Sequence, residues 1–412
     1  MREELLTQLK NASNAAKQLK LVNTETKNKA LLNISIALKN NIQIILDENK
    51  KDLENAKENG ITDAMIDRLK LTEDRIISIA DSVESLIQLH DPVGEVIRTI
   101  ERPNGLLIQQ VRVPIGVFGI IYESRPNVTV DIASLCIKSS NVALLKGGKE
   151  AIYTNTILTK IINDAIKGIL PDHTVQLITG GREDVTDLIT ANEYVDVVVP
   201  RGGKGLIQHV VKNATVSVIE TGAGNCHLYI DDQADMTKAI DISVNAKIQR
   251  PSVCNAIETI LVHKDIAETY LPKMVEAFNG KVEIRGDQKT QSIIECKSVT
   301  EEDYNTEYDD YIVSIKVVDS LEEAIDHIYK YSTKHSECIV TENKIHAEIF
   351  MNALDSACVY HNASTRFSDG GEFGFGAELG ISTQKLHARG PLGLQEMCSF
   401  QYKIYGNGQV RK

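Results

Sequence analysis

The first ninety residues carry apolar side chains at helical spacing, with lysine, glutamate and asparagine between them. Apolar residues recur every three or four positions at Leu31, Ile34, Leu38, Ile42 and Ile45. An α-helix turns once every 3.6 residues, so this spacing gathers the apolar side chains on one face. Residues 1–90 are therefore predicted to form helices that each bury one face, and the Asn-Gly pair at residues 59–60 is predicted to end one of them.

A different pattern runs from residue 96 to residue 112. Two apolar runs, residues 96–100 and 106–112, flank the sequence Arg-Pro-Asn-Gly at residues 102–105. Asn-Gly is a strong turn signal, so these runs are predicted to be the strands of a β-hairpin. We expect the hairpin to project and to pair with another subunit, and residues 400–405, which have strand character, to join it.

Residues 115–220 alternate between strand and helix patterns. Helices are predicted between the strands, notably at residues 128–138 and 151–169. This alternation is typical of a parallel, doubly wound sheet with helices on both faces, and such sheets bind ligands at the carboxyl ends of their strands. The predicted strands are residues 116–121, 142–146, 175–178, 195–199 and 216–219.

Glycines and cations follow three of these strands. Glycine allows a ligand to approach the backbone closely, and lysine or arginine beside it suits phosphate oxygens. One such loop is an ordinary tight turn, but three at corresponding positions predict a nucleotide-diphosphate site, although the GxGxxG and P-loop fingerprints are absent. The residues assigned to this site are Lys146, Gly147, Lys149, Arg201, Gly202 and Gly203.

The second half of the chain is predicted to be another α/β unit. Its acidic residues 301–310 are expected to be a solvated loop. Residues 368–380, rich in glycine and phenylalanine, are expected to be a loop that closes over a ligand, with a long surface loop as the alternative. The predicted strands of this unit are residues 259–262, 312–318, 338–340 and 357–360.

Cys254 stands on a predicted bend after Arg250 and Pro251. Proline disfavours helical geometry in the residue before it, so the chain turns there. A thiol with a cation four residues upstream is a candidate nucleophile in its thiolate form, and a buried structural cysteine is the alternative. Glu220, at a predicted strand end beside a glycine-rich turn, is a candidate base or ligand-positioning group, or else a capping residue.

Composition narrows the class of protein. The chain has 412 residues, 42% hydrophobic and 25% charged, which indicates an ordinary globular protein of two or three domains. A net charge of -12 without a basic stripe argues against nucleic acid as the main partner. Seven cysteines without a CxxC pair indicate free thiols in a reducing cytoplasm. No apolar run has the length of a membrane span and no His/Cys cluster has metal-ligand spacing, so neither a membrane nor a metal is expected.

Four segments together resemble the aldehyde dehydrogenase superfamily over essentially the full chain. They are residues 120–128 (IIYESRPNV), 249–255 (QRPSVCN), the patterned stretch 318–337 and the loop 370–380. The stretch 318–337 closely follows the signature of the branch of the superfamily that reduces γ-glutamyl phosphate.

The resemblance implies an α/β fold with two Rossmann-like domains and a small β oligomerisation element. The cofactor domain would comprise residues 1–95 and 113–226, the catalytic domain residues 227–396, and the oligomerisation element residues 96–112 and 397–412.

The resemblance also implies a reaction. NADPH would reduce L-glutamyl 5-phosphate to L-glutamate 5-semialdehyde and phosphate, the second step from glutamate to proline. Cys254 matches the superfamily nucleophile and would form a thioester, with its own backbone N–H as one oxyanion donor. The position of the usual second donor, an asparagine, falls on Arg125, and Asn127 follows two residues later. Glu220 matches the superfamily's general base, which activates water to hydrolyse the thioester. An acyl-phosphate reductase has no hydrolysis to perform and does not need a base for it.

Cofactor and substrate residues follow from the same resemblance. Lys146 matches the lysine that contacts the adenosine ribose. Lys149 stands where NAD-using members often carry a glutamate, and a lysine there would attract a 2′-phosphate, which favours NADPH/NADP. Glu307 matches the glutamate that holds the nicotinamide ribose. Arg125 and Arg250 are assigned to the substrate's phosphate or α-carboxylate.

Two other functions stay open at this point. A hydrolytic NAD(P)-dependent aldehyde dehydrogenase would share Cys254 and Glu220, although Arg250-Pro251 and the stretch 318–337 argue against it. A catalytically silent oligomeric partner of glutamate 5-kinase is the other. A P-loop kinase is excluded because the chain has no Walker A loop. The chain is expected to form a homo-oligomer, either a dimer or a tetramer. Contact with glutamate 5-kinase is a further possibility, because the acyl phosphate that the kinase makes hydrolyses readily.

Overall fold

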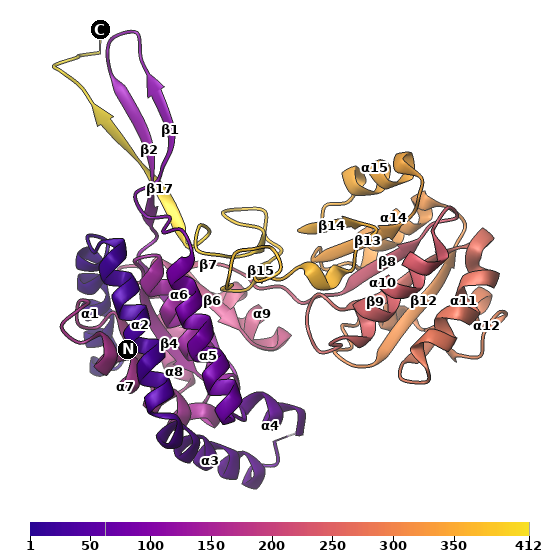
Figure 1. Cartoon of the computed structure of the whole chain (residues 1–412), viewed down its shortest axis with the longest axis horizontal. Coiled ribbons are helices and arrows are strands. Elements are labelled where there is room, and N and C mark those ends of the chain that lie inside the picture. The colour runs from indigo at the N-terminus through magenta and orange to yellow at the C-terminus, as the bar shows by residue number, and fades with distance from the viewer. Residues whose placement is uncertain (62, 412) are drawn as a thin grey trace. The chain divides into compact units, whose positions relative to one another are not determined.

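The computed structural model describes residues 1–61 and 63–411, with the backbone alone for residues 63, 64 and 204. Internal contacts divide the chain into two compact units. The first unit comprises Met1–Thr221, Gly374–Gly380 and Leu392–Lys412, and the second comprises Gly222–Phe373 and Ile381–Pro391. Figure 1 labels many of the elements of both.

Helices fill the N-terminal part of the first unit, as predicted. Four of the five apolar residues that carried the prediction are fully buried, and Ile42 is partly buried. The predicted stop is confirmed, because the third helix ends just before Asn59 and Gly60 has a φ of 68°. The helices are α1 (Glu3–Leu19), α2 (Thr24–Asn40), α3 (Ile42–Glu58), α4 (Asp63–Leu69) and α5 (Glu73–Ser85), with a short 3-10 turn at Leu86–Gln88.

A five-stranded parallel sheet forms the centre of the first unit, in the order β5-β4-β3-β6-β7. The strand order reverses between β3 and β6, and ligands bind beside such a switch point in open α/β sheets. The strands are β3 (Val117–Tyr122), β4 (Val142–Gly147), β5 (Val175–Leu177), β6 (Val197–Arg201) and β7 (Ser217–Val218). The helices between them are α6 (Pro126–Lys138), α7 (Ile152–Ile166), α8 (Arg182–Ile189) and α9 (Lys204–Asn213), with a 3-10 turn at Lys149–Ala151.

The predicted hairpin is confirmed and projects from the helices of the first unit (Figure 1). Its strands are β1 (Val96–Glu101) and β2 (Leu107–Pro114), joined by a turn in which the Gly105 N–H donates to the Arg102 carbonyl at 2.9 Å. The C-terminal strand β17 (Cys398–Tyr405) pairs antiparallel with β2 along its whole length, as expected. Every residue of β17 after Cys398 is exposed.

The second unit contains a seven-stranded parallel sheet in the order β11-β10-β12-β9-β8-β13-β14. The strands are β8 (Cys226–Ile230), β9 (Ile257–His263), β10 (Glu283–Gly286), β11 (Lys297–Ser298), β12 (Ile312–Val318), β13 (Ser336–Val340) and β14 (Cys358–His361). The helices are α10 (Met236–Ile248), α11 (Lys264–Phe278), α12 (Gln288–Gln291), α13 (Glu301–Tyr304), α14 (Leu321–Tyr331) and α15 (Lys344–Ala353). The remaining elements are a 3-10 turn at Thr365–Phe367 and the strand pair β15 (Ile381–Ser382) and β16 (Gly390–Pro391).

Apolar side chains cover both faces of this sheet, which is why its strands read as continuous apolar runs. Leu228 and Ile230 of β8 pack in one buried cluster with residues of α10 and α11. Tyr229, between them in the sequence, points into the opposite cluster with residues of α14 and α15. Among the described residues, no helix combines the length and the apolar character that crossing a bilayer requires.

One sequence prediction is wrong in this unit. The acidic stretch that was expected to be a solvated loop begins with the short helix α13, in which Asp303 and Tyr304 are buried. Asp303 and Thr300 form a reciprocal capping box, and the Arg285 guanidinium donates to Asp303 at 2.5 Å. A helix cap and an ion pair with the partly buried Arg285 hold this carboxylate in place, so the charge of the stretch did not predict its environment.

Candidate functional site

Cys254 lies on an irregular turn between α10 and β9, as the Arg-Pro pair predicted. The Ala256 N–H donates to the Val253 carbonyl at 2.9 Å and closes the turn. Cys254 is partly exposed, whereas five of the other six cysteines are buried. A thiol that reagents and substrates can reach, on a turn, meets the first requirement of a nucleophile.

The backbone of Gly224 touches the backbone of Cys254. A Cβ atom at Gly224 would lie 1.5 Å from the Cys254 carbonyl oxygen, so only glycine fits. The Gly224 N–H donates to Oε1 of Glu307 at 2.6 Å, and the Cys226 thiol donates to the Cys254 carbonyl at 3.1 Å. The turn at Gly224 therefore joins Cys254 to Glu307, two residues that the sequence had assigned separately.

Polar contacts from the patterned stretch 318–337 hold this turn. The Asn225 N–H donates to Oγ1 of Thr333 at 3.0 Å. The Asn225 amide nitrogen donates to the carbonyls of Tyr304 and Tyr331 at 2.7 and 2.8 Å. Asn225 is buried, so these bonds satisfy donors that water does not reach.

Glu337, from the same stretch, anchors the start of β8. Its Oε2 accepts hydrogen bonds from the His227 backbone N–H at 2.9 Å and from His227 Nδ1 at 3.1 Å. Its Oε1 accepts from the hydroxyls of Ser332 and Ser356, the latter at 3.2 Å. His227 and Glu337 are fully buried. The patterned stretch 318–337 thus holds the start of β8, next to the Gly224 turn.

Two further buried histidines near this network, His335 and His327, are not candidates for proton transfer at neutral pH. Burial lowers the pKa of His335 to about 4 and that of His327 to about 2, so both are neutral. Burial also raises the pKa of the Cys226 thiol, which keeps it protonated. These side chains hold the turn in place and leave Cys254 as its accessible thiol.

A buried ion pair joins the helix before the Cys254 turn to the strand after it. Nζ of Lys247, near the end of α10, donates to Oε2 of Glu258 in β9 at 2.6 Å and to the Ile257 carbonyl at 3.0 Å. Burial raises the pKa of Glu258 to about 8, and the Lys247 cation opposes this. The sequence patterns did not predict this pair, although one charged residue stands at each border of the turn, inside otherwise apolar runs.

In the first unit, the loops after β3 and β6 meet at the switch point of the sheet. The Gly203 N–H, at the start of α9, donates to Oε2 of Glu123 at 2.8 Å, and a Cβ at Gly202 would lie 2.4 Å from that oxygen. Ser124 has a φ of 40°, and both its N–H and its hydroxyl donate to Oε1 of Glu150 at 2.8 Å. A carboxylate thus lies where a helix N-terminus attracts anions.

The other residues assigned to the nucleotide lie around the same carboxyl edge. Lys146 is buried, its Nζ donates to the Gly147 carbonyl at 3.0 Å, and burial lowers its pKa. A Cβ at Gly147 would lie 2.2 Å from the Asn155 amide nitrogen. Lys149 is exposed. The Arg201 guanidinium packs closely against the backbone of Gly380.

The remaining assigned residues lie on both units. The Asn127 amide, in the first turn of α6, donates to Oδ2 of Asp131 at 2.9 Å, which fixes its orientation. Burial raises the pKa of Asp131 to about 6, opposed by this hydrogen bond and by the Arg201 charge. Arg125, the N-cap of α6, and Glu220, just after β7, are partly buried. Arg250 is exposed on the Cys254 turn.

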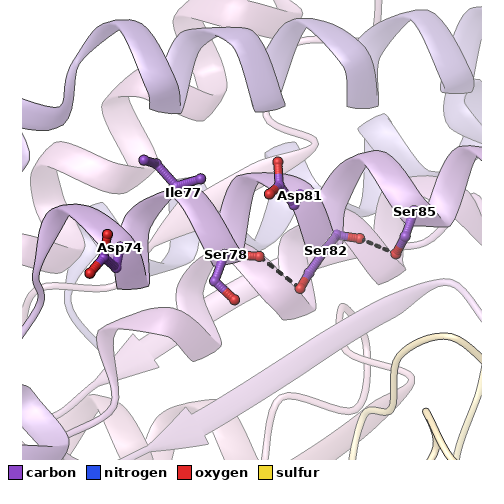
Figure 2. Close-up of a pocket in the computed structure, with 6 residues that line it drawn as sticks. All are labelled: Asp74, Ile77, Ser78, Asp81, Ser82 and Ser85. Carbon is purple, nitrogen blue, oxygen red and sulfur yellow. Dashed lines mark hydrogen bonds between the residues drawn. The ribbon is translucent and has the colours of Figure 1, made fainter.

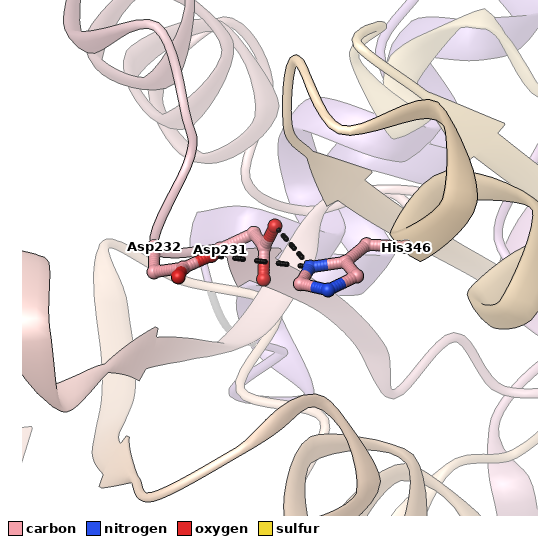
Figure 3. Close-up of side chains that lie close together, drawn as sticks. All are labelled: Asp231, Asp232 and His346. Carbon is pink, nitrogen blue, oxygen red and sulfur yellow. Dashed lines mark hydrogen bonds and ion pairs between the residues drawn. The ribbon is translucent and has the colours of Figure 1, made fainter.

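Two other features hold none of the assigned residues. A surface hollow of about 460 Å³ lies along α5, where the Ser82 and Ser85 hydroxyls bond their own helix backbone (Figure 2). Asp231, Asp232 and His346 lie close together in the second unit (Figure 3). Asp231 already accepts from Tyr229, Thr341 and His346, so its oxygens are used within the protein.

Two features together define the class of protein. One is a doubly wound sheet with glycine-lined loops, and the other is a second sheet with an accessible cysteine on a turn. The chain belongs to the aldehyde dehydrogenase family, whose model matches residues 2–298. It is thus an enzyme of a family that uses NAD(P).

Within this family the chain falls among the gamma-glutamyl phosphate reductases. It is 55% identical to the gamma-glutamyl phosphate reductase of Clostridium perfringens over the whole of both chains, and 52% identical to that of Petrotoga mobilis, again over both whole chains. The crystal structure of the gamma-glutamyl phosphate reductase of Thermotoga maritima superposes over both whole chains with a TM-score of 0.97 and 48% identity. The predicted fold class and the family resemblance are confirmed.

Proposed function

We propose that this protein reduces L-glutamyl 5-phosphate with NADPH to L-glutamate 5-semialdehyde and phosphate, the second step from glutamate to proline. The observation that carries the proposal is the Cys254 turn. Its partly exposed thiol is held by the backbone contact with Gly224, and the same glycine binds the Glu307 carboxylate. The full-length identity with reductases of this name supports the substrate.

In the first step the Cys254 thiolate attacks the acyl carbon of the substrate. A carbon–sulfur bond forms, the carbon–oxygen bond to the phosphoryl group breaks, and phosphate leaves with that electron pair. The Cys254 backbone N–H is the proposed donor to the oxyanion, and Asn127 is the proposed second donor. Glu220 has no water to activate in this reaction, and its proposed role is to help deprotonate Cys254 or to shape the cofactor turn.

In the second step the thioester becomes a thiohemiacetal, which releases the aldehyde and returns the Cys254 thiolate. NADPH, when bound, supplies the hydride for this reduction. The chain's own residues fit a dinucleotide phosphate. The Gly203 N–H, at the start of α9, already binds the Glu123 carboxylate, so it has the polarity that a diphosphate oxygen needs, and Gly202 precedes it in the same loop.

The residues proposed to hold the cofactor divide by the part of it they would contact. Lys146 and Gly147 would bind the adenosine ribose, and exposed Lys149 its 2′-phosphate, which favours NADPH over NADH. Arg201 would serve the diphosphate. Glu307 would hold the nicotinamide ribose, and its bond to the Gly224 N–H keeps it beside the Cys254 turn.

The substrate and assembly assignments complete the proposal. Arg125 and Arg250 would bind the anionic groups of the substrate. The sheet β1-β2-β17, whose last strand is exposed after Cys398, would join subunits into a dimer or tetramer. Residues 1–95 and 113–226 would then form the cofactor domain and residues 227–396 the catalytic domain.

The reverse reaction tests the assignment. NADP⁺ reduction is followed with glutamate semialdehyde in the presence and absence of phosphate, with arsenate as a substitute for phosphate and NAD⁺ as the comparison coenzyme. We expect turnover to require phosphate or arsenate and to prefer NADP⁺. Turnover without either anion would identify a hydrolytic aldehyde dehydrogenase and refute the proposal.

A further inference from the structure

Arg366 lies beside the Cys254 turn although it follows Cys254 by more than one hundred residues. It belongs to the 3-10 turn Thr365–Phe367 of the second unit. The Thr365 hydroxyl donates to the Asn255 carbonyl at 2.6 Å, and the Asn255 amide donates to the Ser368 carbonyl at 2.9 Å. Two hydrogen bonds thus fasten the segment that carries Arg366 to the residue next to Cys254.

The environment of the Arg366 guanidinium is unusual for an arginine that is partly buried. Its Nε donates to Oε1 of Gln249 at 2.8 Å, a neutral partner. In the described part of the chain, no carboxylate forms an ion pair with Arg366, whereas the partly buried Arg389 pairs with Asp355 and Arg285 pairs with Asp303. Withdrawing a cation from water without a counterion costs free energy, so such a site suits an anion from outside.

A second cation lies in the same neighbourhood. Burial lowers the pKa of Arg366, and the Arg250 charge lowers it further, while Asp369, Cys254 and Cys226 act in the opposite direction. Arg366 is therefore close enough to interact electrostatically with both Arg250 and the Cys254 thiol. Two like charges next to a nucleophile favour binding of an anion with more than one negative charge.

We propose that Arg366, together with Arg250, binds the phosphoryl group of the acyl-phosphate substrate. This inference rests on the proposed function. The phosphoryl group is bonded to the carbon that Cys254 attacks, whereas the α-carboxylate stands at the far end of the substrate. Arginine matches phosphate oxygens with two parallel N–H donors, and its charge offsets the negative charge that collects on the leaving phosphate.

The test uses the full-length enzyme and the phosphate-dependent oxidation of glutamate semialdehyde. Arg366→Gln is expected to raise KM for phosphate about tenfold or more, with KM for the semialdehyde nearly unchanged. Arg366→Lys, which keeps the charge but loses the paired donors, is expected to fall between it and wild type. Lys264→Gln removes one exposed cation of the same unit, which pairs with Asp319, and controls for net charge.

A second readout does not depend on turnover. Phosphate is expected to slow alkylation of Cys254 by iodoacetamide in wild type and in Lys264→Gln, and to lose this protection in Arg366→Gln. Circular dichroism checks that each variant folds, and Arg366→Lys keeps the test valid if Arg366→Gln does not.

The outcomes separate this inference from the proposed function. A wild-type enzyme that needs phosphate, with unchanged KM for phosphate in both Arg366 variants, would overturn the role of Arg366 and leave the function standing. A rise confined to KM for the semialdehyde would assign Arg366 to the α-carboxylate and also overturn it. A wild-type enzyme indifferent to phosphate would refute the function, and this inference with it.

Discussion

Replacing Gly224 with alanine perturbs the Cys254 turn through a single added carbon. The new Cβ would lie 1.5 Å from the Cys254 carbonyl oxygen and 2.6 Å from the Cys254 Cα, and both are backbone atoms that no rotamer change can move. Ordinary contact begins at 3.4 Å, so the two backbones must separate by about 1.9 Å. We therefore expect Gly224→Ala to displace Cys254 from the turn at β8.

The magnitude follows from the contacts that this shift breaks. Overpacking a tight site costs about 1–3 kcal/mol. The shift also breaks the bond from the Gly224 N–H to Glu307 and strains the bond from the Asn225 N–H to Thr333, at about 1 kcal/mol or more each. The free energy of unfolding should fall by about 3–5 kcal/mol. A reacting group misplaced by about 1 Å loses roughly 100-fold in rate, so kcat/KM should fall at least that far.

Urea unfolding and the steady-state rate of the reverse reaction measure the two effects. Gly205→Ala is the matched control, because Gly205 lies in α9 and a Cβ there would meet nothing within 4 Å. The control should be neutral or more stable by up to about 1 kcal/mol, since alanine favours helix. A Gly224→Ala enzyme with wild-type stability and kcat/KM would refute the claim that this backbone contact positions Cys254.

Three further changes test other parts of the account. Burial raises the pKa of Asp131 in the folded protein to about 6 from 3.8, so its contribution to stability is greatest below about pH 4 and is lost as pH rises to 6. Asp131→Asn should therefore raise the free energy of unfolding at pH 7 by up to about 3 kcal/mol, and by less to the extent that solvent screens this partly exposed side chain. Urea unfolding that shows no gain would contradict this. Glu337→Gln should lower the free energy of unfolding by about 2–4 kcal/mol and lower kcat, because four hydrogen-bond donors lose a charged acceptor. An unchanged kcat would show that the Glu337 hydrogen bonds do not position the Cys254 turn. Lys149→Glu should raise KM for NADP⁺ at least about tenfold and spare NAD⁺, and equal changes in both would remove Lys149 from the 2′-phosphate.

Local sequence patterns predicted those helices and strands that are determined by neighbouring residues in the sequence. Helical spacing located the N-terminal helices, and the turn signal at residues 102–105 located the hairpin. The strand β8 was missed because it begins with Cys226 and a buried His227. That histidine is compatible with a buried strand only because Glu337, 110 residues later, accepts from its backbone and its ring. No local pattern contains such a partner.

The candidate site divides in the same way. The bend at Cys254 was predictable, because proline restricts the residue before it. The need for glycine at Gly224 depends on how close another backbone comes, which spacing does not reveal. Arg366 was missed for the same reason, since its link to the Cys254 turn runs through Asn255, 111 residues away.

The central claim is that Cys254 forms a thioester that phosphate resolves. Wild-type enzyme and the Cys254→Ser variant are each mixed with NADP⁺ and glutamate semialdehyde in the absence of phosphate. The mass of the peptide that contains residue 254 is then measured by mass spectrometry before and after phosphate is added. The account predicts a burst of NADPH of at most one per subunit, a glutamyl adduct on Cys254 that phosphate discharges, and neither in Cys254→Ser. Continued turnover without phosphate, or equal activity in Cys254→Ser, would contradict it.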